Sequence, residues 1–162
     1  MQHKKVAMIL GSLMLTLAAS IPANAQAQFK GCKAHPTELT CSFTDPFVEG
    51  CNDDSHLVAF AFSPDNYLTV GLRYSPSCQS AWTVVRNDSG LFRPRVRTTI
   101  VSNDGLGSTR DGFPPSGGSV VTEMLYVGPE QPYRTVQAIG RLFDGFTGQR
   151  ISIGQTPFVD PY

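Results

Sequence analysis

The residues with the most definite chemistry in this 162-residue sequence are its four cysteines: Cys32, Cys41, Cys51 and Cys78. An even number of cysteines behind an export signal is typical of a disulfide-stapled domain. Three pairings are possible, and we favour Cys32 with Cys41 and Cys51 with Cys78, because sequential pairing closes two moderate loops. A zinc site is the alternative, but zinc ligands usually come in close pairs, about two to four residues apart, so we assign no metal.

Three arginines alternate along a β-prone segment and would share one face of a strand: Arg93, Arg95 and Arg97. At strand rise their side chains would stand about 6.7 Å apart. Arg86 precedes a turn at residues 87–90 and could extend the row. Guanidinium groups bind phosphates and carboxylates through paired hydrogen bonds, so the row is a candidate site for an anionic polymer. The alternative is a charged edge strand that only resists aggregation.

Catalytic patterns are weak. Only His35 and His56 follow the export signal, and no serine stands in a nucleophile elbow. Asp53 and Asp54 lie close to His56 in sequence, a grouping more typical of a solvated turn than of an acid–base pair, because catalytic partners converge from distant segments. We therefore expect no enzyme, assign no catalytic residue and expect no cofactor.

Residues 1–25 have the pattern of a signal peptide. Two lysines precede an apolar run at residues 6–19 that is too short to span a bilayer, and small residues at Ala23 and Ala25 favour cleavage after Ala25. Residues 26–162 then form a single domain, secreted to the medium, the periplasm or the cell wall, with no transmembrane segment. The near-neutral charge argues against a nucleic-acid partner.

Hydrophobic alternation dominates the rest of the chain and predicts an all-β fold. The clearest case is residues 67–74, which form a hairpin with residues 56–62. The other expected strands are residues 80–86, 91–101, 120–127, 133–143 and a short last one at 149–153. Six or seven antiparallel strands suggest a small β-sandwich or barrel stapled by two disulfides. Residues 102–118, with five glycines, read as a long loop.

Two sequence runs resemble a known family. Residues 45–51 (DPFVEGC) and residues 72–78 (LRYSPSC), followed by Trp82, are similar to the YjfA-like family of small exported bacterial proteins. That family is a disulfide-containing domain of unknown function, and the resemblance covers about residues 32–86. It implies a secreted β domain with paired cysteines and implies no activity.

Four residues near the second bridge are expected to be structural: Gly50, Arg73, Tyr74 and Trp82. Trp82 is expected to cover the disulfide, because large aromatic side chains bury much area, and the alternative is an exposed ring that stacks on a ligand. Arg73 is expected to bond loop carbonyls near Asp45 or the Asp45 carboxylate itself. Gly50 would permit a tight approach at the bridge.

These observations predict a secreted, non-enzymatic binding module whose ligand is an anionic cell-envelope polymer or another secreted protein. The alternative is a small secreted hydrolase or hydrolase inhibitor that acts through residues 102–118.

Overall fold

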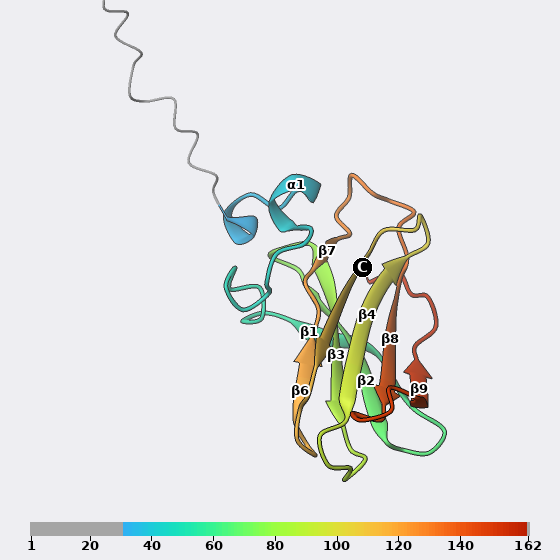
Figure 1. Cartoon of the computed structure of the whole chain (residues 1–162). Helices are drawn as coiled ribbons and strands as arrows, with labels where there is room; N and C mark the ends of the chain where they lie inside the picture. The colour runs from blue at the N-terminus through green and yellow to red at the C-terminus, as the bar shows by residue number, and fades with distance from the viewer. Residues whose placement is uncertain (1–30, 162) are drawn as a thin grey trace, which may run out of the picture.

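The structure, a computed structural model, describes residues 31–161 as two antiparallel β-sheets packed face to face (Figure 1). Sheet A has the order β1-β2-β3-β6, with β7 also paired to β3, and sheet B has the order β5-β4-β8-β9. The strands are β1 (His56–Phe62), β2 (Leu68–Ser75), β3 (Ser80–Asn87), β4 (Arg95–Ser102), β5 (Gly107–Gly112), β6 (Ser119–Val121), β7 (Leu125–Tyr126), β8 (Val136–Phe143) and β9 (Arg150–Gln155). The all-β prediction is confirmed, as a sandwich. The expected signal peptide at residues 1–25 lies outside the described residues.

The main core lies between the sheets and follows from strand alternation. Leu68, Val70 and Leu72 of β2 point inward, and Ile100 of β4 and Leu142 of β8 face them from sheet B. All five side chains are fully buried, and each such burial stabilises the fold by about 1.5–3 kcal/mol. The side chains at the outward positions of the same strands do not contribute to this core.

A second core covers one end of the outer face of sheet A. The N-terminal segment, which holds a 3-10 turn η1 (Cys32–Ala34) and the short helix α1 (Glu38–Cys41), packs there. The disulfide Cys51–Cys78 joins the segment to the connection between β2 and β3, and Cys32–Cys41 closes a loop within the segment. This is the sequential pairing. All four cysteines contact a cluster with three fully or almost fully buried residues: Trp82, Met124 and Tyr126.

The helix α1 is only one turn long and depends on its cap. The Thr37 hydroxyl accepts a hydrogen bond from the Thr40 amide at 3.2 Å, and the Thr40 hydroxyl accepts one from the Thr37 amide at 3.0 Å. This reciprocal pair satisfies two amides that a helix start leaves without partners. None of the helices in residues 31–161 is long and apolar enough to cross a membrane.

The prediction of a long loop at residues 102–118 was wrong, because β5 (Gly107–Gly112) lies within this range. The strand is polar and lies at the edge of sheet B, so it shows no hydrophobic alternation. Cross-strand side-chain pairs hold it to β4, among them the Thr99 and Thr109 hydroxyls, whose oxygens are 3.1 Å apart. Only residues 103–106 and 113–118 remain as connections.

Three expected strands also have limits that differ by three residues or more. The strand expected at residues 133–143 is β8 and begins only at Val136. The strand expected at residues 91–101 begins at Arg95, because Arg93 has a φ of 49° and turns the chain before Pro94. The strand expected at residues 120–127 is split into β6 and β7. Between them the Met124 amide donates to Thr44 and the Met124 carbonyl accepts from Phe43, so the N-terminal segment takes over the pairing.

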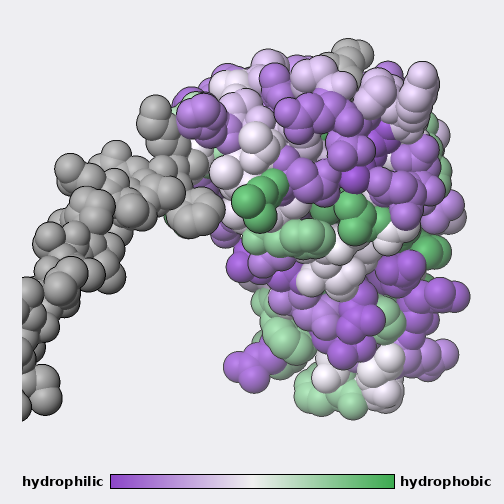
Figure 2. Space-filling view, turned by 90° about the horizontal axis from the view of Figure 1, so that it is seen from above, coloured by the Kyte–Doolittle hydropathy of each residue, from purple (hydrophilic) through white to green (hydrophobic). Residues whose placement is uncertain are grey.

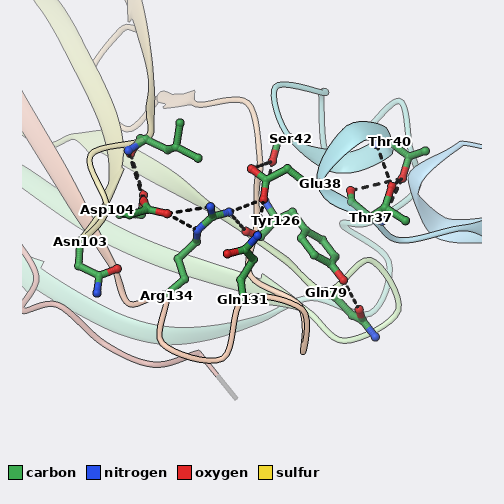
Figure 3. Close-up of polar contacts among 12 residues, drawn as sticks. Thr37, Glu38, Thr40, Ser42, Gln79, Asn103, Asp104, Tyr126, Gln131 and Arg134 are labelled. Atoms are coloured by element: carbon green, nitrogen blue, oxygen red, sulfur yellow. Dashed lines mark hydrogen bonds and ion pairs between the residues drawn. The ribbon is translucent and has the colours of Figure 1, made fainter.

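A buried arginine ties the helix α1 to the loops at the same end of the sandwich (Figure 3). The Arg134 side chain is 5% exposed and contacts Glu38 of α1 at 2.8 Å, Asp104 at 2.8 Å and the carbonyl of Tyr126 at 2.8 Å. The Ser102 hydroxyl also donates to Asp104. The hydrogen bond from Ser102, and after it those from Arg134, hold the pKa of Asp104 below its ordinary value of 3.8, although burial acts in the opposite direction. Figure 2 shows this end from above, with hydrophilic residues predominating.

Removing the second disulfide should cost more than removing the first. For the change of Cys51 and Cys78 to alanine we expect a loss of about 3.5 kcal/mol in the free energy of unfolding, because the sequence separation is 27 residues. For Cys32 and Cys41, with a separation of 9, we expect about 2.5 kcal/mol. Urea unfolding followed by the fluorescence of Trp82, the single tryptophan, measures both. A larger loss from the first pair would contradict the loop-closure argument.

The change Asp104→Asn should lower the free energy of unfolding at neutral pH by roughly 1–2 kcal/mol, less than for a fully buried pair because Asp104 is 43% exposed. The pKa of Asp104 is lowered in the folded state, so its contribution is complete above the ordinary value of 3.8 and is lost as the pH falls through the lowered pKa. Urea unfolding of both proteins from about pH 7 to about pH 2 tests this. The control is Asp53→Asn, since Asp53 is 73% exposed. A difference that already shrinks above about pH 5 would contradict the assignment.

Candidate anion-binding face

The outer surface of sheet B carries three arginines around one aromatic ring. Arg95 and Arg97 are outward positions of β4, Phe143 stands opposite Arg95 on β8, and Arg141 stands opposite Arg97. We call these four residues the arginine face. All four are partly exposed, whereas Val96, between the two β4 arginines, is fully buried.

Alternation along the strands explains why the arginines point outward together. Val96 and Ile100 of β4 and Leu142 of β8 occupy the alternate positions and fill the core between the sheets. In a strand, burial of one set of positions forces the other set to the opposite face. The antiparallel register then sets Arg97 directly across from Arg141.

Arg95 is held by the ring of Phe143. Its guanidinium carbon lies 4.6 Å from the ring centroid, and that of Arg97 lies 5.7 Å from the same centroid. Cation–π contacts of this kind stabilise by about 0.5–1 kcal/mol at exposed sites. The buried Nε of Arg95 has no hydrogen-bond partner among the described residues, so this guanidinium retains an unused donor.

Asp111 of β5 neutralises Arg97. The Nε and one terminal nitrogen of Arg97 each donate to an Asp111 oxygen at 2.8 Å. These bonds raise the pKa of Arg97 and hold the pKa of Asp111 below its ordinary value. Both side chains are a little over one-third exposed, so the pair contributes about 1 kcal/mol or less to stability. The pair mainly fixes the orientation of the Arg97 guanidinium group.

Arg141 has no ion-pair partner among residues 31–161. Since Asp111 balances only one of the three arginines, the arginine face carries an excess of two positive charges. Like charges directly opposite on neighbouring strands are destabilising. Such a surface can bind multiply charged anions through preset guanidinium groups.

Two of the four arginines predicted for this site lie elsewhere. Arg93 stands outside β4 in the bend that its positive φ creates, with its guanidinium 5.3 Å from the ring centroid of Phe92. Arg86 belongs to β3 of sheet A, where its Nε lies 2.8 Å from Asp88. The turn at residues 87–90 leads from one sheet to the other, so Arg86 cannot extend a row on β4.

Sequence reasoning missed Arg141, because its pairing with Arg97 depends on the register of strands that are about 40 residues apart. The alternation in residues 136–143 predicts that Arg141 points outward. It does not predict that Arg97 lies beside Arg141, because no local pattern says which strands are neighbours in the sheet.

The residues expected to be structural divide between the two cores. Trp82 packs with the disulfides, whereas Tyr74 points into the core between the sheets. Arg73 donates to the carbonyl of Ser55 at 2.9 Å and to its hydroxyl, and not to Asp45. Gly50 has a φ of 70°, so the turn before the second bridge requires its left-handed conformation.

No acid–base pair forms between Asp53, Asp54 and His56 in the structure. Asp53 pairs with Lys33 at 3.1 Å, and Asp54 accepts hydrogen bonds from the hydroxyl of Ser75 and the amide of Ser77. The His56 ring packs edge-on against Tyr74, with the ring centroids 5.8 Å apart. These side chains therefore shape the loop before β1.

One group of described residues has ligand atoms close enough for a metal: Cys32, Cys51 and Cys78. Each of the three is bonded in a disulfide, so none offers a thiolate in the oxidised protein.

A comparison with protein families gives one match. The family described as "Protein of unknown function (DUF2690)" matches residues 39–139, which include all of β4 with Arg95 and Arg97 and end within β8, before Arg141 and Phe143. No curated protein and no solved structure matches the chain.

The change Arg141→Gln should raise the free energy of unfolding by a few tenths of a kcal/mol, because it removes the repulsion from Arg97. Urea unfolding at about 10 mM and about 0.5 M salt measures the change, and the gain should shrink at the higher salt. The control is Arg150→Gln, an exposed arginine at the start of β9. A stability loss specific to Arg141→Gln would contradict the unfavourable pairing.

Proposed function

The chain belongs to the DUF2690 family, whose function is unknown, and from this premise we propose that it is an exported, non-enzymatic module that binds an anionic cell-envelope polymer. The observation that carries the proposal is the arginine face, where three guanidinium groups share one balancing carboxylate. The ligand class is a polymer with repeating phosphates or carboxylates.

The spacing of the arginine face suits a repeating ligand. Arg95 and Arg97 stand two residues apart on one strand, about 6.7 Å, and Arg141 stands across the sheet at about 5 Å from Arg97. An extended chain that lies along β4 and crosses to β8 can reach all three groups. Bonds from guanidinium to phosphate or carboxylate are charge-assisted and form at fixed angles, which favours such ligands over neutral ones.

The chemistry of the cysteines supports an exported location. Two disulfides with no free cysteine among the described residues indicate an oxidising compartment. The signal-like pattern of residues 1–25 and the similarity of residues 45–51 and 72–78 to YjfA-like exported proteins agree with that location. An envelope polymer is the anion such a protein would meet there. The hydrolase or inhibitor alternative has weaker support, because β5 divides its proposed loop.

The test removes three charges from the arginine face with Arg95→Gln, Arg97→Gln and Arg141→Gln together. A matched control removes three charges elsewhere, with Arg93→Gln, Arg110→Gln and Arg150→Gln. Calorimetric titration with sodium polyphosphate and with poly-glutamate, at about 0.05 M and about 0.5 M salt, measures binding. We expect the first variant to lose at least about tenfold in affinity, because each charge-assisted contact contributes about 1.5–3 kcal/mol before solvent screening.

Retention of the exported protein on the cell envelope should follow the same order, with the control close to the unmodified protein. Equal losses in both triple variants would show a response to net charge alone. Undiminished binding and retention in the first variant would exclude the arginine face as the site.

A further inference from the structure

The outer face of sheet A holds a cavity of about 320 Å³ beside the end that the N-terminal segment covers. Its floor is formed by outward positions of β2 and β3, where Gly71 stands opposite Val84 and Thr69 stands opposite Arg86. Arg73, opposite Trp82, marks the boundary with the covered end. The volume lies at the lower end of the range for small-molecule sites, about 300–1,000 Å³. The cavity is on the other sheet from the arginine face.

Gly71 makes room for the cavity. It lies in the middle of β2 with no positive φ, so its backbone conformation does not require glycine. A Cβ built there would lie 3.0 Å from the Cδ1 of Leu57. A glycine inside a strand weakens the strand and often marks a place where a ligand approaches closely.

The walls of the cavity are apolar and remain exposed. Leu57 is 50% exposed and Phe62 is 57% exposed, both on β1, the edge strand of sheet A. The ring of Phe60, 59% exposed, packs edge-on against that of Phe62, with the centroids 5.7 Å apart. Apolar side chains gathered at this exposure beside a cavity are typical of a binding surface.

Both charged residues that line the cavity are arginines, and each is fixed by a contact at one side of its guanidinium. Arg73 uses its Nε and one terminal nitrogen on Ser55. Arg86 uses its Nε on Asp88, whose other oxygen accepts from the hydroxyl of Thr69 at 2.7 Å. Guanidinium groups held in this way keep further N–H donors for an anion.

We infer that this cavity binds a small amphipathic anion, a molecule with an apolar body of one ring system or a short alkyl chain and one carboxylate, phosphate or sulfonate group. The apolar body packs over Gly71 and Val84 between the side chains of β1. The anionic group accepts hydrogen bonds from Arg86, and Arg73 stands at the other end of the cavity, opposite Trp82 and four residues along β3 from Arg86. Complementary charge favours an anion, because two arginines line the cavity and Asp88, which pairs with Arg86, balances only one of them.

The test uses the intact mature protein and the fluorescent probe 8-anilinonaphthalene-1-sulfonate, which combines an aromatic body with one sulfonate. We expect one probe per chain, displaced by decanoate or decyl phosphate and not by decyltrimethylammonium. If decanol displaces the probe as well as decanoate does, the arginines do not select the ligand and the inference fails. A ratio of one probe to two chains would place the probe between two copies and overturn the assignment to this cavity.

Three variants locate the site. Arg86→Gln removes the charge, Phe62→Ala removes a wall and Gly71→Val fills the floor, and each should weaken probe binding by about tenfold or more. Far-ultraviolet circular dichroism and Trp82 emission establish that each variant is folded. Matched controls are Arg150→Gln and Phe146→Ala, since Phe146 is an exposed aromatic residue outside this cavity.

The controls should bind the probe as the unmodified protein does. Unchanged binding in all folded cavity variants would overturn the inference, as would a loss confined to Phe146→Ala. Because the arginine face lies on the other sheet, its triple variant should keep full probe binding. The cavity and the proposed polymer site can therefore fail separately.

Discussion

The packing of Trp82 against two disulfides is the contact on which the N-terminal part of the structure depends. Residues 31–55, around α1, form no strand. The disulfides and the burial of the Trp82 indole hold them against sheet A. The indole N–H has no hydrogen-bond partner among the described residues, and leaving a buried donor unpaired costs about 1–3 kcal/mol. Apolar packing and the two neighbouring disulfides therefore hold the Trp82 ring, and no hydrogen bond from a described residue orients it.

The same packing makes the two outer faces of the sandwich different. On sheet A the N-terminal segment covers one end, and the cavity over Gly71 lies just beyond it. On sheet B none of the residues 31–161 covers the arginine face in this way, and charged side chains occupy its outward positions. One face therefore offers an apolar hollow flanked by cations, and the other offers a flat array of guanidinium groups.

The features that could be predicted from the sequence are those set by neighbouring residues, and the features that could not are contacts between distant segments. The limits of β1 and the inward set of β2 were readable, because alternation is a property of neighbouring residues. β5 was not, since an edge strand held by polar cross-strand pairs carries no hydrophobic period. The pairing of Arg97 with Arg141 and the contacts of Arg134 join segments far apart in sequence, and only the sheet register and loop packing bring them together.

The dependence of the N-terminal segment on disulfides also bears on the state of the chain before oxidation. Without the bridge Cys51–Cys78, the segment loses its cross-link to sheet A, and packing alone holds it over Trp82. Local opening of this kind costs little free energy where few buried contacts remain. A compartment that keeps thiols reduced thus leaves this part of the chain loosened, and oxidation to the two disulfides closes it. The packed form of the N-terminal segment is therefore the form that an oxidising environment favours.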